Sequence, residues 1–178
     1  MSTLTVKELA APTGYDLKIA AGETLDLKSQ GTVTMPAGSV LQVVQASSGS
    51  ETVTSSSSYV DVTNLSATIT PSATSSKILV LATLNGCLKN ASNTSLKANI
   101  VRGSTQLQQM TAITMTTDSS AYIGVGTVSG EHLDSPNTTS ATTYKCQIAS
   151  VAGSANVRVN TSDNGGATST ITLMEIAG

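Results

Sequence analysis

The run Lys77–Leu88, with the sequence Lys-Ile-Leu-Val-Leu-Ala-Thr-Leu-Asn-Gly-Cys-Leu, constrains the fold of this chain more than any other stretch. It is the longest apolar run and carries no charge after its first residue. A strand that is apolar on both faces is typical of one buried on both faces. A buried helix is the rival interpretation, but the run is short for one and Asn85-Gly86 interrupts it. We therefore expect a central β-strand.

Alternation along this strand defines two faces. One face would carry Ile78, Val80, Ala82 and Leu84, and the other Leu79 and Leu81. A strand of this kind predicts a sandwich-like core.

Other short segments with strand-like alternation follow one another at even spacing, and no segment has a convincing helical period. They are Ser39–Ala46, Glu51–Thr54, Tyr59–Val62, Leu65–Thr70, Leu96–Arg102, Gln106–Met115, Ala121–Val128, Thr142–Val151, Val157–Asn160 and Ser169–Ile176. Glycine turns at Arg102–Thr105 and Asp163–Gly166 predict hairpins, and the second is the stronger signal.

The fold class predicted from these segments is all-β: an antiparallel β-sandwich, jelly-roll-like, over residues 39–178. We expect Ser39–Ala46 to lie near Ser169–Ile176, because a sandwich closes best when its terminal strands pair.

The composition supports strands built without large aromatic residues. Ser and Thr make up about three in ten of the 178 residues, and Phe and Trp are absent. The core must then come from Val, Ile, Leu, Ala and Thr, and β-branched residues favour strands. Disorder is the alternative for a chain so rich in Ser and Thr. Apolar residues recur at strand spacing throughout, which argues against it.

Residues 1–38 differ from the rest, because their short strand-like pieces are punctuated by glycine. Leu17–Leu25 and Val33–Leu41 echo each other at an offset of 16. Two copies of a repeat cannot bury their own apolar faces. We therefore expect residues 1–38 to form an attachment arm that becomes ordered against another chain.

The charge pattern excludes several classes of partner. The net charge is −2, with neither a basic cluster nor an aromatic platform, so we expect no nucleic acid and no anionic membrane as partner. The start of the chain lacks the basic and apolar regions of a signal peptide. This favours synthesis in a reducing cytoplasm, and we expect Cys87 and Cys146 to be free, buried thiols.

The residues that might carry chemistry have structural explanations instead. His132 is the only histidine, and we interpret it as a surface loop residue. Gly124-x-Gly126 is interpreted as strand or bulge glycine. Asp163–Gly166 is interpreted as a turn rather than a calcium site. The Asn-x-Ser/Thr sequences at Asn64, Asn90, Asn93, Asn137 and Asn160 read as accidents of composition. We therefore predict no enzyme, and no catalytic, cofactor-binding or metal-binding residues.

Three segments carry a resemblance to a known family: Met35–Gln45, Thr68–Val80 and Leu173–Gly178. They resemble segments of structural proteins of tailed bacteriophages, cyanophages especially, over about residues 33–178. The resemblance implies a homotrimer with jelly-roll heads and an N-terminal attachment arm. The family has no common catalytic residue to carry over.

Two functions follow as hypotheses. The first is a capsid decoration (cement) protein or short head fibre on the virion surface, bound to the major capsid protein or another virion protein through residues 1–38. The second is a tail-fibre module that recognises a host surface glycan or protein. The chain is short for a receptor-binding fibre, and its only aromatics are Tyr15, Tyr59, Tyr122 and Tyr144, which favours the first.

Overall fold

The structure is a computed structural model. It describes residues 35–111, 123–161 and 166–178, together with Thr13 and Ala21. The chain divides into two units, Met1–Thr34 and Met35–Gly178. The second unit contains every strand named below and is considered by itself. Most of the predicted arm, residues 1–38, lies outside the described residues.

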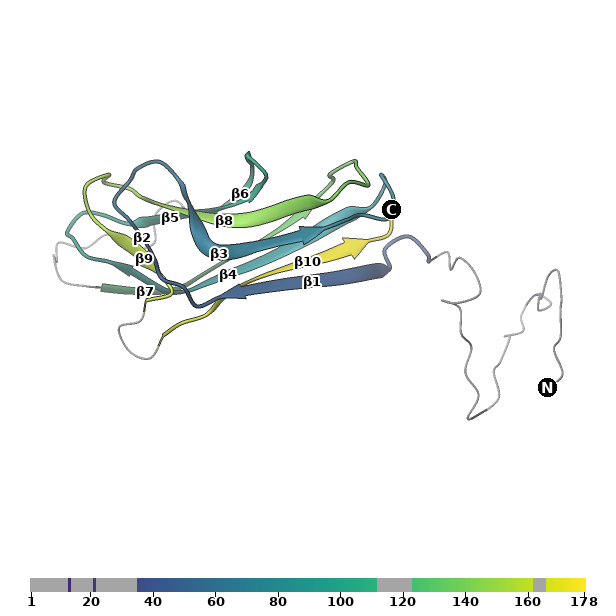
Figure 1. Ribbon diagram of the computed structural model, residues 1–178, viewed down its shortest axis with the longest axis horizontal. Coiled ribbons are helices and arrows are strands. Elements are labelled where there is room, and N and C mark those ends of the chain that lie inside the picture. Colours follow the sequence, from purple (N-terminus) through teal and green to yellow (C-terminus); the bar gives the residue numbers. More distant parts are fainter. Residues whose placement is uncertain (1–12, 14–20, 22–34, 112–122, 162–165) are drawn as a thin grey trace. The chain divides into compact units, whose positions relative to one another are not determined.

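Ten β-strands, and no helix, make up the described part of the chain (Figure 1). In chain order they are β1 (Val40–Ser48), β2 (Thr52–Thr54), β3 (Val60–Ile69), β4 (Lys77–Lys89), β5 (Leu96–Arg102), β6 (Thr105–Thr111), β7 (Ile123–Asp134), β8 (Thr142–Ser150), β9 (Val157–Val159) and β10 (Ser169–Ile176).

Eight of these strands form four antiparallel pairs that are nested along the chain, as in a single long hairpin folded over on itself. β1 pairs with β10, β3 with β8, β4 with β7 and β5 with β6, all antiparallel. Rolling places β10 beside β4, and β8 beside β5. The result is two packed sheets, ordered β1-β10-β4-β7 and β3-β8-β5-β6, which is the strand order of a jelly roll. The predicted sandwich, and the predicted pairing of its terminal strands, are confirmed.

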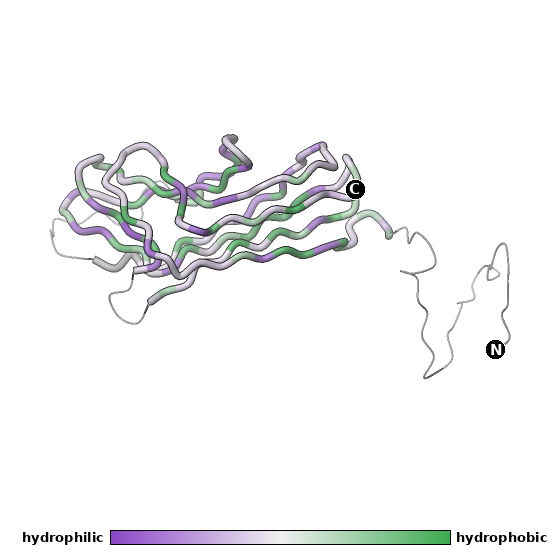
Figure 2. The backbone as a smooth tube through the Cα atoms, in the orientation of Figure 1, coloured by the Kyte–Doolittle hydropathy of each residue, from purple (hydrophilic) through white to green (hydrophobic). Residues whose placement is uncertain are grey.

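The core lies between the two sheets, where inward-facing aliphatic side chains meet. Hydrophobic residues, green in Figure 2, alternate with polar ones along the strands, so each strand has one face for this interior. From β4 the core receives Ile78, Val80, Ala82 and Leu84, all buried as predicted. Opposite them, β8 contributes Tyr144, Cys146 and Ile148.

The other face of β4 differs from the prediction. Leu79 and Leu81 are half-buried rather than buried, so the expectation that β4 is buried on both faces is wrong for this face. The second sheet packs against the inward face alone. This leaves an apolar strand face at the surface of the sandwich.

Two predicted boundaries are also corrected. The segments Tyr59–Val62 and Leu65–Thr70 form the single strand β3, whose pairing with β8 is irregular between Asp61 and Ser66. Asn64 lies in this irregular stretch with φ 57°. An irregularity of this kind interrupts the alternation in sequence without ending the strand.

The hairpin predicted between Val157–Asn160 and Ser169–Ile176 is wrong. β9 pairs with β2 and with Leu88 and Lys89 of β4, whereas β10 pairs with the opposite end of β4. Residues 162–165 of the predicted turn lie outside the described residues. The other predicted hairpin is confirmed, because Arg102 pairs with Thr105 across Gly103-Ser104.

Gly86 allows β4 to run on past the point where the sequence suggested an interruption. Its φ is 59°, and the pairing of β4 with β7 shifts here. A Cβ atom on Gly86 would lie 2.7 Å from the Cβ of Ala167 and 3.0 Å from the backbone nitrogen of Thr161. Glycine is therefore required both for backbone conformation and for space.

Candidate functional site

The prediction that His132 lies in a surface loop is wrong. It lies on β7, which extends to Asp134. It is half-buried and pairs across the sheet with Val80. Within residues 35–111, 123–161 and 166–178, no three His, Cys, Asp or Glu side chains gather as they do around a metal ion. The same residues contain no helix that is long and apolar enough to cross a membrane.

The asparagines of the Asn-x-Ser/Thr sequences have a backbone role. Four of them adopt positive φ: Asn64 (57°), Asn93 (53°), Asn137 (52°) and Asn160 (58°). Asparagine tolerates this left-handed conformation better than most residues. Chain reversal and irregular pairing therefore explain these positions.

The glycines of Gly124-x-Gly126 lie within β7, as predicted. Gly126 has φ 87° and pairs with Cys87 where the register between β4 and β7 shifts. It is therefore a bulge glycine. Of Asp163–Gly166, only Gly166 is described, with φ 77°.

Cys87 and Cys146 are free thiols buried between the sheets, as predicted. Burial raises the pKa of both thiols to about 12. Each therefore remains protonated at neutral pH, and the thiol form is a poor nucleophile. These cysteines act as small core residues.

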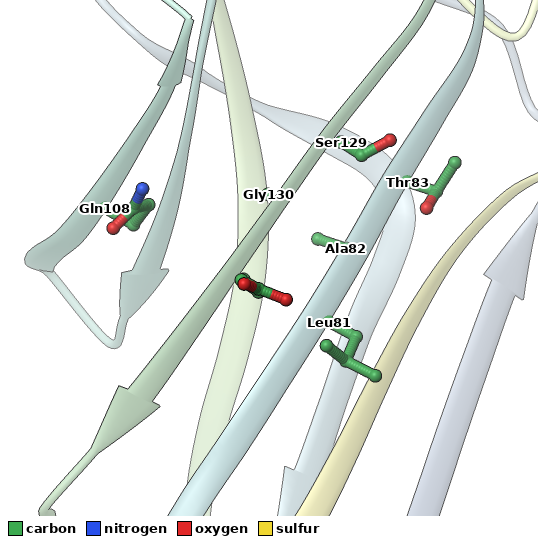
Figure 3. A pocket seen from close by; sticks show the side chains of 7 residues that line it. Leu81, Ala82, Thr83, Gln108, Ser129 and Gly130 are labelled. Atoms are coloured by element: carbon green, nitrogen blue, oxygen red, sulfur yellow. The ribbon is translucent and has the colours of Figure 1, made fainter.

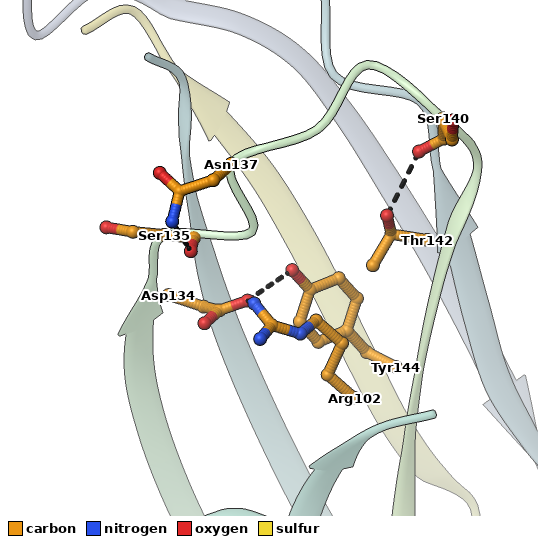
Figure 4. Close-up of polar contacts among 7 residues, drawn as sticks. All are labelled: Arg102, Asp134, Ser135, Asn137, Ser140, Thr142 and Tyr144. Carbon is orange, nitrogen blue, oxygen red and sulfur yellow. Dashed lines mark hydrogen bonds and ion pairs between the residues drawn. The ribbon is translucent and has the colours of Figure 1, made fainter. Parts of the chain in front are cut away.

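Asp134 joins the two sheets at one end of the sandwich (Figure 4). Its Oδ2 accepts a hydrogen bond of 2.7 Å from the hydroxyl of Tyr144 on β8. The same oxygen forms an ion pair with Nη1 of Arg102 on β5, also at 2.7 Å. Burial, and then the adjacent Asp134 carboxylate, raise the pKa of Tyr144. The carboxylate is neutralised and positioned, so this cluster holds β7 to the second sheet.

Glu175 forms a second buried carboxylate cluster, on β10. Its side chain has no exposed surface. Oε1 accepts hydrogen bonds from the backbone nitrogen (2.7 Å) and hydroxyl (2.6 Å) of Ser72 and from the hydroxyl of Ser76 (2.7 Å), and Oε2 accepts one from Nε2 of Gln42 (2.6 Å). Although burial opposes ionisation, these donors hold the pKa of Glu175 at about 2.

Neither carboxylate is placed for catalysis. The oxygens of Glu175 are occupied by protein donors, and Asp134 is buried against Arg102 and Tyr144. A general acid or base must reach the proton that it transfers. The chemistry available to a partner must therefore come from the surface.

One surface is unusual: the face of the sheet β1-β10-β4-β7 that points away from the core, hereafter the outer face. Val43, Met174, Leu79 and Leu133 lie directly opposite one another on the four strands, and we call these four the apolar row. Val43 is 55% exposed and Leu133 50% exposed. Val40 and Leu41 extend the exposed apolar surface along β1. Contiguous apolar surface of this kind marks interaction sites.

A hollow lies near the apolar row, at the edge of the sandwich where β7 approaches β6 of the other sheet (Figure 3). It lies over β4 and β7, and Gln108 of β6 borders it. Its other lining residues are Leu81, Ala82, Thr83, Ser129, Gly130 and Glu131. Small residues at 83, 129 and 130 make the surface recede here.

The outer face of the other sheet is polar by contrast. Asp61 accepts hydrogen bonds from Nζ of Lys145 (2.6 Å) and Nε2 of Gln147 (2.7 Å), and the hydroxyls of Thr68 and Thr143 are 2.7 Å apart. These polar side chains are satisfied within the chain, although Oδ1 of Asn99, opposite Gln147 on the same face, has no hydrogen-bond partner. The asymmetry between the two outer faces identifies the apolar one as the candidate site.

The described aromatic residues do not form a sugar-binding platform. Tyr144 is buried, and the half-buried ring of Tyr59 lies 5.5 Å from Nζ of Lys97. Tyr15 and Tyr122 lie outside the described residues.

The sequence contains a signal for the outer face. Alternation places Leu79 and Leu81 opposite the core face of β4, as the structure does, but their apolar character predicts burial within the chain. Sequence alternation assigns a residue to a face, whereas only the fold shows whether a layer covers that face.

The fold and the site define a jelly-roll protein with an exposed apolar face on one of its two sheets. No protein-family model and no curated protein matches the chain.

Solved structures similar to the chain include the VP2 subviral particle of infectious bursal disease virus, at 16% identity and a TM-score of 0.41, and the Gt strain of that virus, at 17% and 0.41. These matches cover 94% and 95% of this chain but 46% and 47% of the viral chains, so this chain spans about half their length. At this TM-score they carry no argument about function.

Proposed function

We propose that the protein is a non-enzymatic structural protein of a bacteriophage virion: a homotrimeric capsid decoration (cement) protein or short head fibre on the virion surface. The observation that carries this proposal is the apolar outer face. The described groups that might perform chemistry, such as Cys87, Cys146 and Glu175, are buried and held by the core, whereas an apolar sheet face is left for contact. The resemblance of Met35–Gln45 and Leu173–Gly178 to phage structural proteins supplies the virion context.

Attachment is assigned to the N-terminal segment, through which the protein would bind the major capsid protein or another virion protein. The sandwich includes Gly38 and Ser39, whose backbones form 2.8 Å hydrogen bonds with Ala177. A deletion that tests attachment should therefore stop at residue 34.

Two experiments test the proposal. Gold-labelled antibody against the protein should decorate the shell of virions in electron micrographs, and label confined to tail tips would contradict the decoration role. Protein lacking residues 1–34 should keep its melting temperature but fail to bind particles that lack the protein. Full occupancy by the deleted protein would overturn the role of the arm.

The alternative is a tail-fibre module that recognises a host surface glycan or protein. A depression on the other sheet favours it, with Asp61, Asn64 and Lys145 among its lining residues. No aromatic residue lines this depression within the described part of the chain, whereas sugar sites commonly stack a ring. Binding of labelled protein to host cells, and its loss in Asp61→Ala, would support this alternative.

A further inference from the structure

We propose that the outer face of the sheet β3-β8-β5-β6 (Figure 1) carries a binding site for a neutral saccharide. The site is built on four polar side chains that lie opposite one another on the four strands: Asp61, Gln147, Asn99 and Gln109. We call these four the polar row. The inference goes beyond the proposed function, because the site belongs to the folded chain wherever the protein lies on a virion. The alternative function would use the same site.

The polar row points away from the core. The residues that flank Asn99 on β5 and Gln147 on β8 are buried in the core. Because side chains alternate between the two faces of a strand, Asn99 and Gln147 lie on the outer face. At the two ends of the row, Asp61 and Gln109 are exposed. The row therefore runs across the whole width of this sheet.

Asn99 carries the observation that points to a ligand. It is 1% exposed, and its Nδ2 donates a hydrogen bond of 3.1 Å to Oε1 of Gln106 on β6. No group in the described part of the chain donates to its Oδ1. A buried acceptor without a donor costs free energy, so nearly all such atoms in native proteins have a partner. The missing partner of Oδ1 is therefore a donor from outside the chain.

The neighbours of Asn99 have further hydrogen-bonding capacity. Gln147 donates through Nε2 to Oδ1 of Asp61 at 2.7 Å, and this bond leaves its Oε1 as an acceptor. Gln106 and Gln109 are exposed, so these long side chains can turn toward a ligand and give it access to Asn99. A saccharide hydroxyl both donates and accepts, which matches a row of amide oxygens and nitrogens.

The charges on this face favour a neutral ligand. Lys97 lies on one side of the polar row and Lys145 on the other. An ammonium or guanidinium group would be repelled by these two lysines, and the carboxylate of the row, Asp61, is already paired with Lys145 at 2.6 Å. A carboxylate ligand has no proton to donate to Oδ1 of Asn99. A hydroxyl donates without charge, and a sugar carries several hydroxyls.

Space for the ligand lies at the β3 end of the row. Asp61 and Lys145 also line a depression of about 380 Å³, together with Asn64 and Thr143. This volume falls within the range of small-ligand sites, about 300–1,000 Å³. A saccharide seated on the polar row can therefore extend past Asp61 into the depression.

The test is binding of the full chain to an array of neutral oligosaccharides of glucose, galactose, mannose and N-acetylglucosamine. We expect at least one of them to bind, with a loss of affinity of about tenfold or more in Gln147→Ala and in Gln109→Ala. Gln45→Ala is the matched control, because Gln45 is an exposed glutamine on β1 of the other sheet; it should bind as the wild type does.

Asn99→Leu removes the unpaired acceptor at similar side-chain volume and should also lose binding. Circular dichroism and melting establish which variants fold. The two glutamine variants keep the test decisive if Asn99→Leu does not fold.

The class of ligand has its own test. Binding of the neutral saccharide should change less than about twofold between roughly 50 and 500 mM salt, because salt screens interactions between charges. Polygalacturonate and polylysine, offered as a polymeric anion and cation, should bind more weakly. Stronger binding of either polymer, with a steep salt dependence, would overturn the neutral ligand.

The outcomes separate this inference from the proposed function. If no saccharide on the array binds, or if Gln147→Ala and Gln109→Ala bind as well as Gln45→Ala, the site is wrong and the virion role is untouched. Binding that the polar-row variants lose, together with label over the shell, would support both. Label confined to tail tips would overturn the decoration role and leave the site standing.

Discussion

Glu175 and Asp134 lie on either side of Ile78 in one cross-strand row, and both carboxylates point into the sandwich. They are stabilised differently. Asp134 has the cation of Arg102 and the hydroxyl of Tyr144, whereas the hydrogen-bond donors around Glu175 are two serines and a glutamine. This difference sets the first two predictions.

Glu175→Gln should destabilise the sandwich by about 2–3 kcal/mol at neutral pH, because the amide cannot accept all the charge-assisted hydrogen bonds that the carboxylate accepts. Urea denaturation measures this free energy of unfolding. Asp61→Asn is the control: it also replaces a carboxylate by an amide, but at an exposed ion pair worth at most about 1 kcal/mol. Equal losses in the two variants would contradict the role given to Glu175.

The stability of the wild-type protein should fall in acid because of Glu175. Its folded-state pKa of about 2 lies below the ordinary 4.5, so its contribution is complete above about pH 4.5 and is lost as the pH falls toward 2. Asp61 contributes in the same direction. Burial would raise the pKa of its carboxyl group, but hydrogen bonds from Lys145 and Gln147 stabilise the carboxylate and lower it. Glu175→Gln should flatten this part of the pH profile. A profile as steep as that of the wild type would refute the assignment.

Tyr144→Phe should cost about 1–3 kcal/mol of unfolding free energy, because it removes a buried donor to Asp134 while the ring still fills the core. Tyr59→Phe removes a hydroxyl from a half-buried ring and should change stability by less than about 0.5 kcal/mol. Chemical denaturation of the pair distinguishes a sheet-joining hydrogen bond from a general effect of losing a hydroxyl. Similar values for both variants would count against the former.

Gly86→Ala should destabilise the protein more than Gly103→Ala, although the two glycines have nearly the same φ, 59° and 57°. The backbone strain, about 1 kcal/mol, is common to both. The added methyl at Gly86 would meet Ala167 and Thr161, whereas at Gly103 it would meet nothing within 4 Å. We expect the difference in melting temperature to be several degrees. Equal changes in melting temperature would show that the chain around Gly86 moves to accommodate the added methyl group.

Cys87 and Cys146 should resist iodoacetamide in the folded protein and react fully in urea without reductant. Both thiols are buried, and their pKa values of about 12 keep them protonated. Mass spectrometry of the alkylated protein measures the modification. Rapid alkylation of either residue under native conditions would contradict its place in the core.

The sequence by itself determined the strands and their faces, because side chains alternate every two residues and this period is local. It separated Ile78 from Leu79 correctly, and it predicted that β1 and β10 lie together. It failed where a local signal was ambiguous: Asn64 does not end β3, and the alternation at Val157 does not identify the strand that pairs with it.

Only the tertiary structure decided which faces are covered and which polar groups meet. Glu175 is 99 residues from Ser76 and 133 from Gln42 in the chain, so no local pattern marks their contact. Leu79 and Leu81 have the composition of a buried face, yet their exposure depends on where the second sheet lies. Which strands pair, and which face of a sheet is covered by the other sheet, depend on residues far apart in the chain. The two-residue alternation of side chains carries no information about either.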